Sequence, residues 1–129
     1  MVVPLTTAFT NALLNILRGS SVTGVSPLYV GLFNGVPGSG GVEVTGGGSG
    51  YARQLVTLTA PSNGTVQNAA DVVFGPIVTA WGTFTHVALM DGSGTVYAYA
   101  AFIGDGSGTL ITQTITLPAG TLTWSLTSS

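Results

Sequence analysis

The last third of the chain consists of short apolar segments separated by glycine-rich turns, and this alternation restricts the possible folds more than any other feature. The pentapeptide Asp-Gly-Ser-Gly-Thr occurs at 91–95 and again at 105–109, and Pro-Ala-Gly follows at 118–120. Apolar runs of about four to eight residues between such turns are typical of antiparallel strands joined by hairpins. The sequence therefore predicts a C-terminal meander over about 83–127, either in one sheet or divided between two sheets at Pro118.

One amphipathic helix is expected before the strands, over about 5–18. The apolar residues that would line its single buried face are Leu5, Phe9, Leu13, Ile16 and Leu17. Their spacing is that of one helical face, and Gly19 supplies a C-terminal stop. Residues 28–33 and 52–59 are expected strands, and 66–78 is expected as shorter pieces around Gly75-Pro76. The predicted fold class is mainly β: one antiparallel, jelly-roll-like β-sandwich domain over 1–129 with one short N-terminal α-helix.

The predicted helix cannot be stable in isolation. Burial of five apolar side chains contributes about 8–12 kcal/mol, whereas fixing about thirteen residues costs a similar or larger entropy. The helix must therefore dock on the sheet or on a neighbouring subunit. Phe9 and Leu13 are the candidate contact residues on its apolar face.

Ionised side chains are unusually scarce in this chain. Two arginines and four acidic residues give 5% charged residues, with no lysine, no cysteine and one histidine, whereas an ordinary chain is about 25% charged. Acid–base catalysis and metal binding need such groups, so we expect no enzyme, no catalytic residue, no metal and no cofactor. A net charge of −2 argues against binding of nucleic acid. The sequence lacks an uninterrupted run of about 18 apolar residues, so we expect no membrane-spanning helix.

The scarcity of charge also predicts contact with other protein. A lone soluble domain relies on surface charge to stay in solution, and this chain has little. We therefore expect a closed homo-oligomer, in which neighbouring copies cover part of each surface. Charge scarcity predicts buried surface but does not fix the number of subunits.

Two constellations suggest chemistry, and each has a simpler structural explanation. Each Asp-Gly-Ser-Gly loop brings one carboxylate, whereas calcium takes about six to eight oxygen ligands, so both loops are predicted to be hairpin turns. His86 and Asp91 could be a base and its orienting acid. Five residues apart in an extended strand, however, they point to opposite faces about 16 Å from each other. His86 is therefore predicted to be structural.

Four further residues are candidates for contacts with a partner. Glu43 and Arg53 flank the glycine-rich loop at 46–50, and a pairing between them would anchor that loop. The alternative is a partner for Arg53 across a subunit boundary. Tyr97 and Tyr99 alternate with alanines and are expected on one face of their strand. If exposed, they would stack on sugars or form a protein contact; if buried, they belong to the core.

Several segments carry a family resemblance when taken together. They are Leu-Tyr-Val-Gly-Leu-Phe at 28–33, Glu43-Val44, Gly-Tyr-Ala-Arg-Gln at 50–54, Trp81-Gly82, Thr85-His86 and Asp91. In this order, and from the helix residues 11–14 through to Leu122, the chain resembles a family of small tailed-bacteriophage virion proteins, often labelled tail fibre proteins. The resemblance implies a compact β-sandwich related to trimeric capsid decoration proteins and to distal tailspike modules. It implies no catalytic residues.

Two functions follow from these expectations. The first is an outer-capsid decoration (cement) protein on the virion surface, a homotrimer bound to the major capsid protein. The number three comes from the resemblance. The alternative is a tail fibre or baseplate tip module that binds host-surface glycans. Because a tip module is usually fused to a shaft, a chain occupied by one domain favours cement. The copy number per virion would separate the two.

Overall fold

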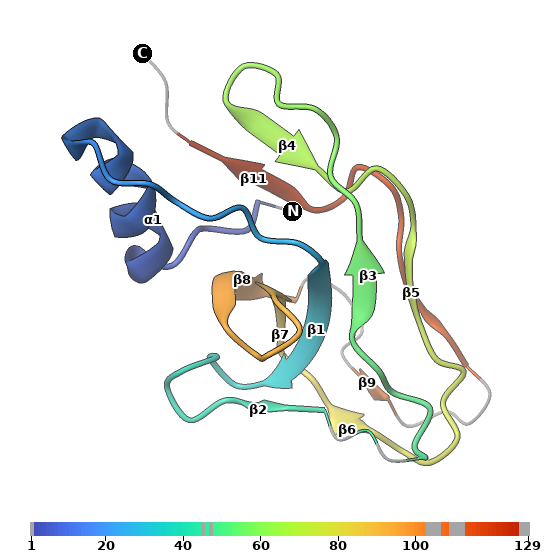
Figure 1. The fold of residues 1–129 in the computed structure, drawn as a ribbon. Coiled ribbons are helices and arrows are strands. Elements are labelled where there is room, and N and C mark those ends of the chain that lie inside the picture. The colour runs from blue at the N-terminus through green and yellow to red at the C-terminus, as the bar shows by residue number, and fades with distance from the viewer. Residues whose placement is uncertain (1, 45, 47, 103–106, 109–112, 127–129) are drawn as a thin grey trace.

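The computed structural model of the chain describes residues 2–44, 46, 48–102, 107–108 and 113–126 (Figure 1). The described part is mainly β, with antiparallel sheets and one N-terminal helix, as the sequence predicts. The elements are α1 (Thr7–Leu14), the 3₁₀ turn η1 (Asn15–Arg18), β1 (Leu28–Asn34), β2 (Val42–Glu43), β3 (Gln54–Val56), β4 (Thr65–Gln67), β5 (Val72–Phe74), β6 (Gly82–Thr83), β7 (His86–Met90), β8 (Val96–Ala101), β9 (Ser107–Gly108), β10 (Ile115–Leu117) and β11 (Thr123–Ser125).

The main sheet is organised around β1, which is paired along both of its edges. β7 pairs antiparallel with one edge, from Tyr29 opposite Met90 to Phe33 opposite His86, and β8 continues the sheet beyond β7. The other edge of β1 is shared by two strands, with β3 along its first half and β2 at its end. β1 is thus the central strand of the molecule (Figure 1).

The N-terminal segment runs along the outer edge of β8. The backbone N–H of Thr6 donates to the Tyr97 carbonyl at 2.8 Å, and the N–H of Tyr99 donates to the Pro4 carbonyl at 3.2 Å. These bonds bring α1 against β8, where the Phe9 ring meets the Tyr97 ring edge-on at a centroid distance of 4.9 Å. The helix is therefore docked on the sheet of its own chain. This contact supplies the stabilisation that a helix unstable in isolation needs.

The helix begins later than the apolar spacing predicts. Thr6 is the N-cap, and its Oγ1 accepts the backbone N–H of Phe9 at 3.3 Å. Leu5 was expected in the helix but lies in an isolated antiparallel bridge opposite Ala98 of β8. The edge of β8 offers backbone partners to the segment before the cap, so that segment is extended.

The end of the helix also departs from the predicted single apolar face. α1 tightens into the 3₁₀ turn η1 at Asn15, and the chain leaves it at Gly19, whose φ is 87°. A 3₁₀ turn has about 3.0 residues per turn, against about 3.6 in an α-helix, so the buried face does not continue. Ile16 and Leu17, predicted on that face, are 52% and 84% exposed.

The second layer consists of two strand pairs, β10 with β5 and β11 with β4. One hydrophobic cluster joins this layer to the main sheet. Its buried members include Leu32 of β1, Phe74 of β5, Leu117 of β10 and Trp124 of β11. The core therefore lies between the two layers, as expected for a β-sandwich.

Among the described residues, the first hairpin is the part of the predicted meander that forms. β7 pairs with β8 across the turn at Asp91, whereas β10 and β11, on the two sides of Pro118, pair with β5 and β4. Pro118 thus separates two strands that pair in different sheets, but both of these sheets belong to the second layer; the change from the main sheet to the second layer comes earlier, between β8 and β10. In the second pentapeptide, Asp105 and Thr109 lie outside the described residues. Ser107 and Gly108 form β9, which pairs with β6.

Asn68 is the buried polar residue of the described part, at 1% exposure. Its Nδ2 donates to the carbonyls of Ala70 at 3.0 Å and Pro118 at 2.9 Å, and its Oδ1 accepts the backbone N–H of Leu122 at 2.9 Å. One side chain thus links the segment after β4 to the turn between β10 and β11.

Candidate functional site

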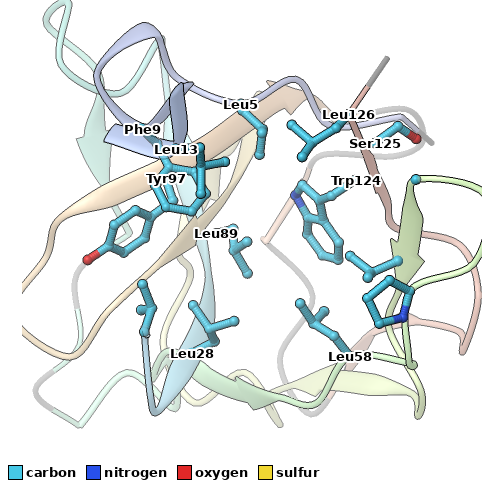
Figure 2. Close-up of a pocket in the computed structure, with 14 residues that line it drawn as sticks. Leu5, Phe9, Leu13, Leu28, Leu58, Leu89, Tyr97, Trp124, Ser125 and Leu126 are labelled. Carbon is cyan, nitrogen blue, oxygen red and sulfur yellow. The ribbon is translucent and has the colours of Figure 1, made fainter. Parts of the chain in front are cut away.

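An apolar cleft opens beside α1, at one end of the core (Figure 2). Its volume is about 350 Å³, which is at the small end of the range of about 300–1,000 Å³ for ligand pockets. The lining residues come from the helix region, both layers and the hairpin before β4. They are Leu5, Phe9, Leu13, Val25, Leu28, Leu58, Pro61, Gly64, Val66, Leu89, Tyr97, Trp124, Ser125 and Leu126. Hydrocarbon therefore forms nearly the whole wall, and the cleft suits an apolar occupant.

Trp124 contributes a buried polar group, its indole N–H, to this wall. The residue is 4% exposed, and its Nε1–H has no acceptor within hydrogen-bond distance among the described residues. The ring of Trp124 lines the cleft (Figure 2), while its nitrogen is enclosed by neighbouring protein atoms. A buried donor without a partner costs about 1–3 kcal/mol.

Tyr97 is placed at the cleft by an irregularity in β8. The pairing of β7 with β8 shifts between Leu89 and Met90, which leaves Tyr97 as an extra residue. A β-bulge of this kind reorients the side chains next to it. Tyr97 therefore lines the cleft, while Tyr99 packs with the separate cluster that contains Met90. The expectation that the two tyrosines share a face is wrong.

The hydroxyl of Tyr97 is fixed by the turn that follows β7. It donates to Asp91 Oδ2 at 2.9 Å, and burial together with this carboxylate raises the pKa of Tyr97. Asp91 Oδ1 accepts the backbone N–H groups of Ser93 and Thr95 at 3.0 Å each. Hydrogen bonds from Ser93 and Thr95 lower the pKa of Asp91 to about 2. Asp91 is thus a turn-forming residue, and its carboxylate is engaged within its own loop.

An apolar tip projects from the end of the helix region, formed by Leu14 and Leu17. Leu14 is 55% and Leu17 is 84% exposed, and residues three apart lie on the same side of a 3₁₀ turn. Arg18 is next to this tip, and its guanidinium donates to Asn15 Oδ1 at 3.3 Å. The tip is therefore an aliphatic projection with one adjacent positive charge.

Glu43 and Arg53 form the ion pair that the sequence analysis proposed across the glycine-rich loop. Arg53 NH2 lies 2.8 Å from Glu43 Oε1, and Arg53 Nε donates to Oε2 at 2.9 Å. The hydroxyl of Tyr51 donates to the same Oε2 at 2.9 Å, and Arg53 NH1 donates to the Gly92 carbonyl at 3.1 Å. The hydrogen bond to Glu43 raises the pKa of Arg53, and burial raises the pKa of Tyr51. The pair anchors two loops.

A second, smaller hollow of about 200 Å³ lies next to this ion pair. Its wall mixes polar and apolar groups and includes Asn34, Glu43, Trp81 and Thr83. The indole of Trp81 is held in place, because its Nε1–H donates to the Ser49 carbonyl at 2.8 Å. This hollow therefore presents a fixed aromatic ring beside polar side chains.

The described residues do not assemble a catalytic constellation around His86. Its Nδ1 is 2.8 Å from the hydroxyl of the adjacent Thr85, and its ring lies 6.3 Å from the ring of Tyr99. Asp91, its suggested partner, is engaged in the turn described above. Within the described ranges there is no cluster of three or more potential metal ligands, and no helix is long and apolar enough to cross a bilayer.

The structure thus divides the six predicted contact residues among three places. Phe9, Leu13 and Tyr97 meet at the cleft, Glu43 and Arg53 form the ion pair, and Tyr99 lies apart with His86. Sequence reasoning did not identify Trp124 as a site residue. Its alternation with the core residue Leu122 predicts burial, but nothing in the sequence predicts an indole N–H without a partner.

Comparison with known proteins identifies a family for the chain. No curated protein matches the chain. The family model described as podophage GP4 fiber I protein gp80 matches residues 4–125, which is most of the chain. The matched region includes the helix, both layers and every residue that lines the cleft except Leu126. The chain therefore belongs to the podophage GP4 fiber I protein gp80 family, a family of structural fibre proteins of the phage virion.

Proposed function

We propose that the chain is a non-catalytic structural subunit of the phage fibre and that it assembles with copies of itself. The observation that carries the proposal is the apolar tip, Leu14 and Leu17, exposed on a chain with very few charges. Large apolar side chains that project together from a surface mark protein contact sites. In a fibre, the most abundant surface available to such a tip is another copy of the same subunit.

The low charge supports self-association in a second way. Identical copies carry the same net charge, here only −2, so they repel each other weakly and apolar contacts decide the association. Surface ion pairs contribute little and are screened by salt. We therefore expect the assembly to persist at high ionic strength. A closed homotrimer is the state that we propose.

The location that we propose is the fibre and not the capsid shell. An outer-capsid cement bound to the major capsid protein is the first expectation from the sequence. The family description supports the fibre, which was the alternative. Immunogold labelling of intact virions separates the two, because a fibre subunit is labelled on the tail and a cement on the shell.

Binding of a host-surface glycan is a second candidate function, favoured by the smaller hollow. Trp81 presents a ring held by its own hydrogen bond, and Asn34 and Thr83 stand beside it. Sugar rings combine an apolar C–H face with polar hydroxyls, which match an aromatic surface and neighbouring polar groups. Adsorption of phage carrying Trp81→Ala, compared with wild type, tests this role. Unchanged adsorption would contradict it.

Self-assembly is tested by sedimentation velocity over a dilution series of the purified protein. We expect an oligomer at micromolar concentration. Leu17→Ser should weaken the association by about tenfold to a hundredfold, because it removes one aliphatic side chain from the contact. Leu55→Ser is the matched control, since Leu55 is 61% exposed on β3 and lies outside the tip. A monomer at every concentration would overturn the proposal.

A further inference from the structure

We propose that the apolar cleft is the docking site for a second copy of the chain, which inserts its tip, Leu14 and Leu17, between α1 and Trp124. This inference rests on the proposed self-assembly and adds the two surfaces that meet. One copy supplies the projection and the next supplies the hollow, so each subunit carries both halves of the contact.

The size of the cleft fits this occupant. A dry, engineered apolar cavity of about 150 Å³ holds one benzene molecule. The cleft here has about 350 Å³, which is room for about two groups of that size. Leu14 and Leu17 are two branched aliphatic side chains on one side of the turn, both more than half exposed.

Electrostatics do not oppose the contact. None of the residues that line the cleft is ionised, so docking an aliphatic tip requires no charge to be desolvated inside it. Arg18 follows Leu17 directly and can remain at the rim, with its guanidinium in water. An anionic or cationic ligand would find no counter-charge in this wall, which favours an uncharged occupant.

Two symmetries allow this contact. Because one subunit carries both the projection and the hollow, two copies can exchange tips about a two-fold axis, or a larger number can associate head-to-tail. The head-to-tail arrangement closes into a ring when the rotation between copies divides a full turn. A closed trimer is one such ring, and it is the arrangement that we propose.

The test uses the absence of cysteine from the chain. Leu17→Cys and Leu126→Cys are prepared as separate proteins with tags of different mass; Leu126 lines the cleft and is 53% exposed. After mixing and mild oxidation, we expect a mixed disulfide dimer that joins the two tags. In the control, Leu55→Cys takes the place of Leu126→Cys, because Leu55 lies outside the cleft. The yield of the mixed dimer should then be at least tenfold lower.

A second measurement observes the indole itself. In a Trp81→Phe background, Trp124 is the remaining tryptophan, and its emission should shift as dilution separates the subunits and opens the cleft that its ring lines to water. Leu17→Ser should show the dissociated emission at concentrations where the parent is assembled. This readout does not depend on disulfide formation.

The outcomes separate this inference from the proposed function. An oligomer without the mixed dimer and without the shift overturns the docking inference and leaves self-assembly standing. A monomer throughout overturns both. A small apolar molecule retained by the purified protein, detected by native mass spectrometry and lost on Leu13→Asp or Leu89→Asp, would also overturn it, because the cleft would then have another occupant.

Discussion

Replacement of Asn68 should be among the most damaging single changes in this fold. The side chain is buried and bonds three backbone groups, the carbonyls of Ala70 and Pro118 and the N–H of Leu122. In Asn68→Ala these three bonds are lost; the N–H of Leu122 is left buried without its acceptor, whereas the Pro118 carbonyl keeps its bonds from Thr121. The segment after β4 and the turn between β10 and β11 then lose their shared link.

The magnitude follows from the number of bonds. Each hydrogen bond contributes about 1 kcal/mol net, and more when the remaining partner stays buried and unsatisfied. Three bonds at 2.9–3.0 Å therefore give a loss of about 3 kcal/mol, with a range of about 2–5 kcal/mol. Asn68→Asp should cost at least as much at neutral pH, because a carboxylate can accept from Leu122 but faces two carbonyl oxygens. Lowering the pH restores one donor and should narrow that difference.

Urea unfolding followed by circular dichroism measures this effect. We expect a lower midpoint with an unchanged slope, since the surface exposed on unfolding stays the same. Asn34→Ala is the control, because Asn34 is exposed at the end of β1 and surface substitutions usually change the free energy of unfolding by less than about 0.5 kcal/mol. A change of that small size for Asn68→Ala would refute the reasoning.

Three further predictions concern the loops. Glu43→Gln should lower the free energy of unfolding by about 1 kcal/mol, because the partly exposed pair with Arg53 loses its charge while its shape is kept; urea unfolding at low and high salt checks this. The pKa of Asp91 is about 2 when folded and 3.8 ordinarily, so its contribution is present above about pH 4 and lost as the pH falls toward 2. The stability difference between wild type and Asp91→Asn should vanish over that window. Gly50→Ala should cost more than about 1 kcal/mol in thermal unfolding, because φ is +89° and the new Cβ would meet a facing backbone carbonyl.

Alternation of apolar residues was enough to predict what is buried in the last strand. Leu122 and Trp124 lie in the core, as their spacing indicates, because each strand places every second side chain on one face. The partners of the strands could not be predicted in the same way. Ile115 faces Phe74 across β10 and β5, and nothing in the alternation of either segment selects the other as its neighbour.

Two local features limited the prediction of the site. The tight turn at Asn15 changes the helical period, so Leu17 is exposed although its spacing from Leu13 suggested burial. The bulge in β8 moves Tyr97 to the cleft and away from Tyr99. Apolar spacing shows which side chains share a face only while the backbone keeps a regular period, and a 3₁₀ turn or a bulge breaks that period. The Glu43–Arg53 pair was predictable, because two opposite charges flank one loop in a chain that has few others.

The edges of the main sheet affect how the fibre subunits behave before they assemble. β2 and β3 occupy the outer edge of β1, and the segment around Thr6 occupies the outer edge of β8. An open strand edge is a template to which further chains add without limit, as in amyloid. The strands that then border the β1 side of the sheet, β2 and β3, are only two and three residues long, so newly made subunits offer little template for polymerisation through their backbones before assembly. Growth then stops at the number of copies that side-chain contacts allow.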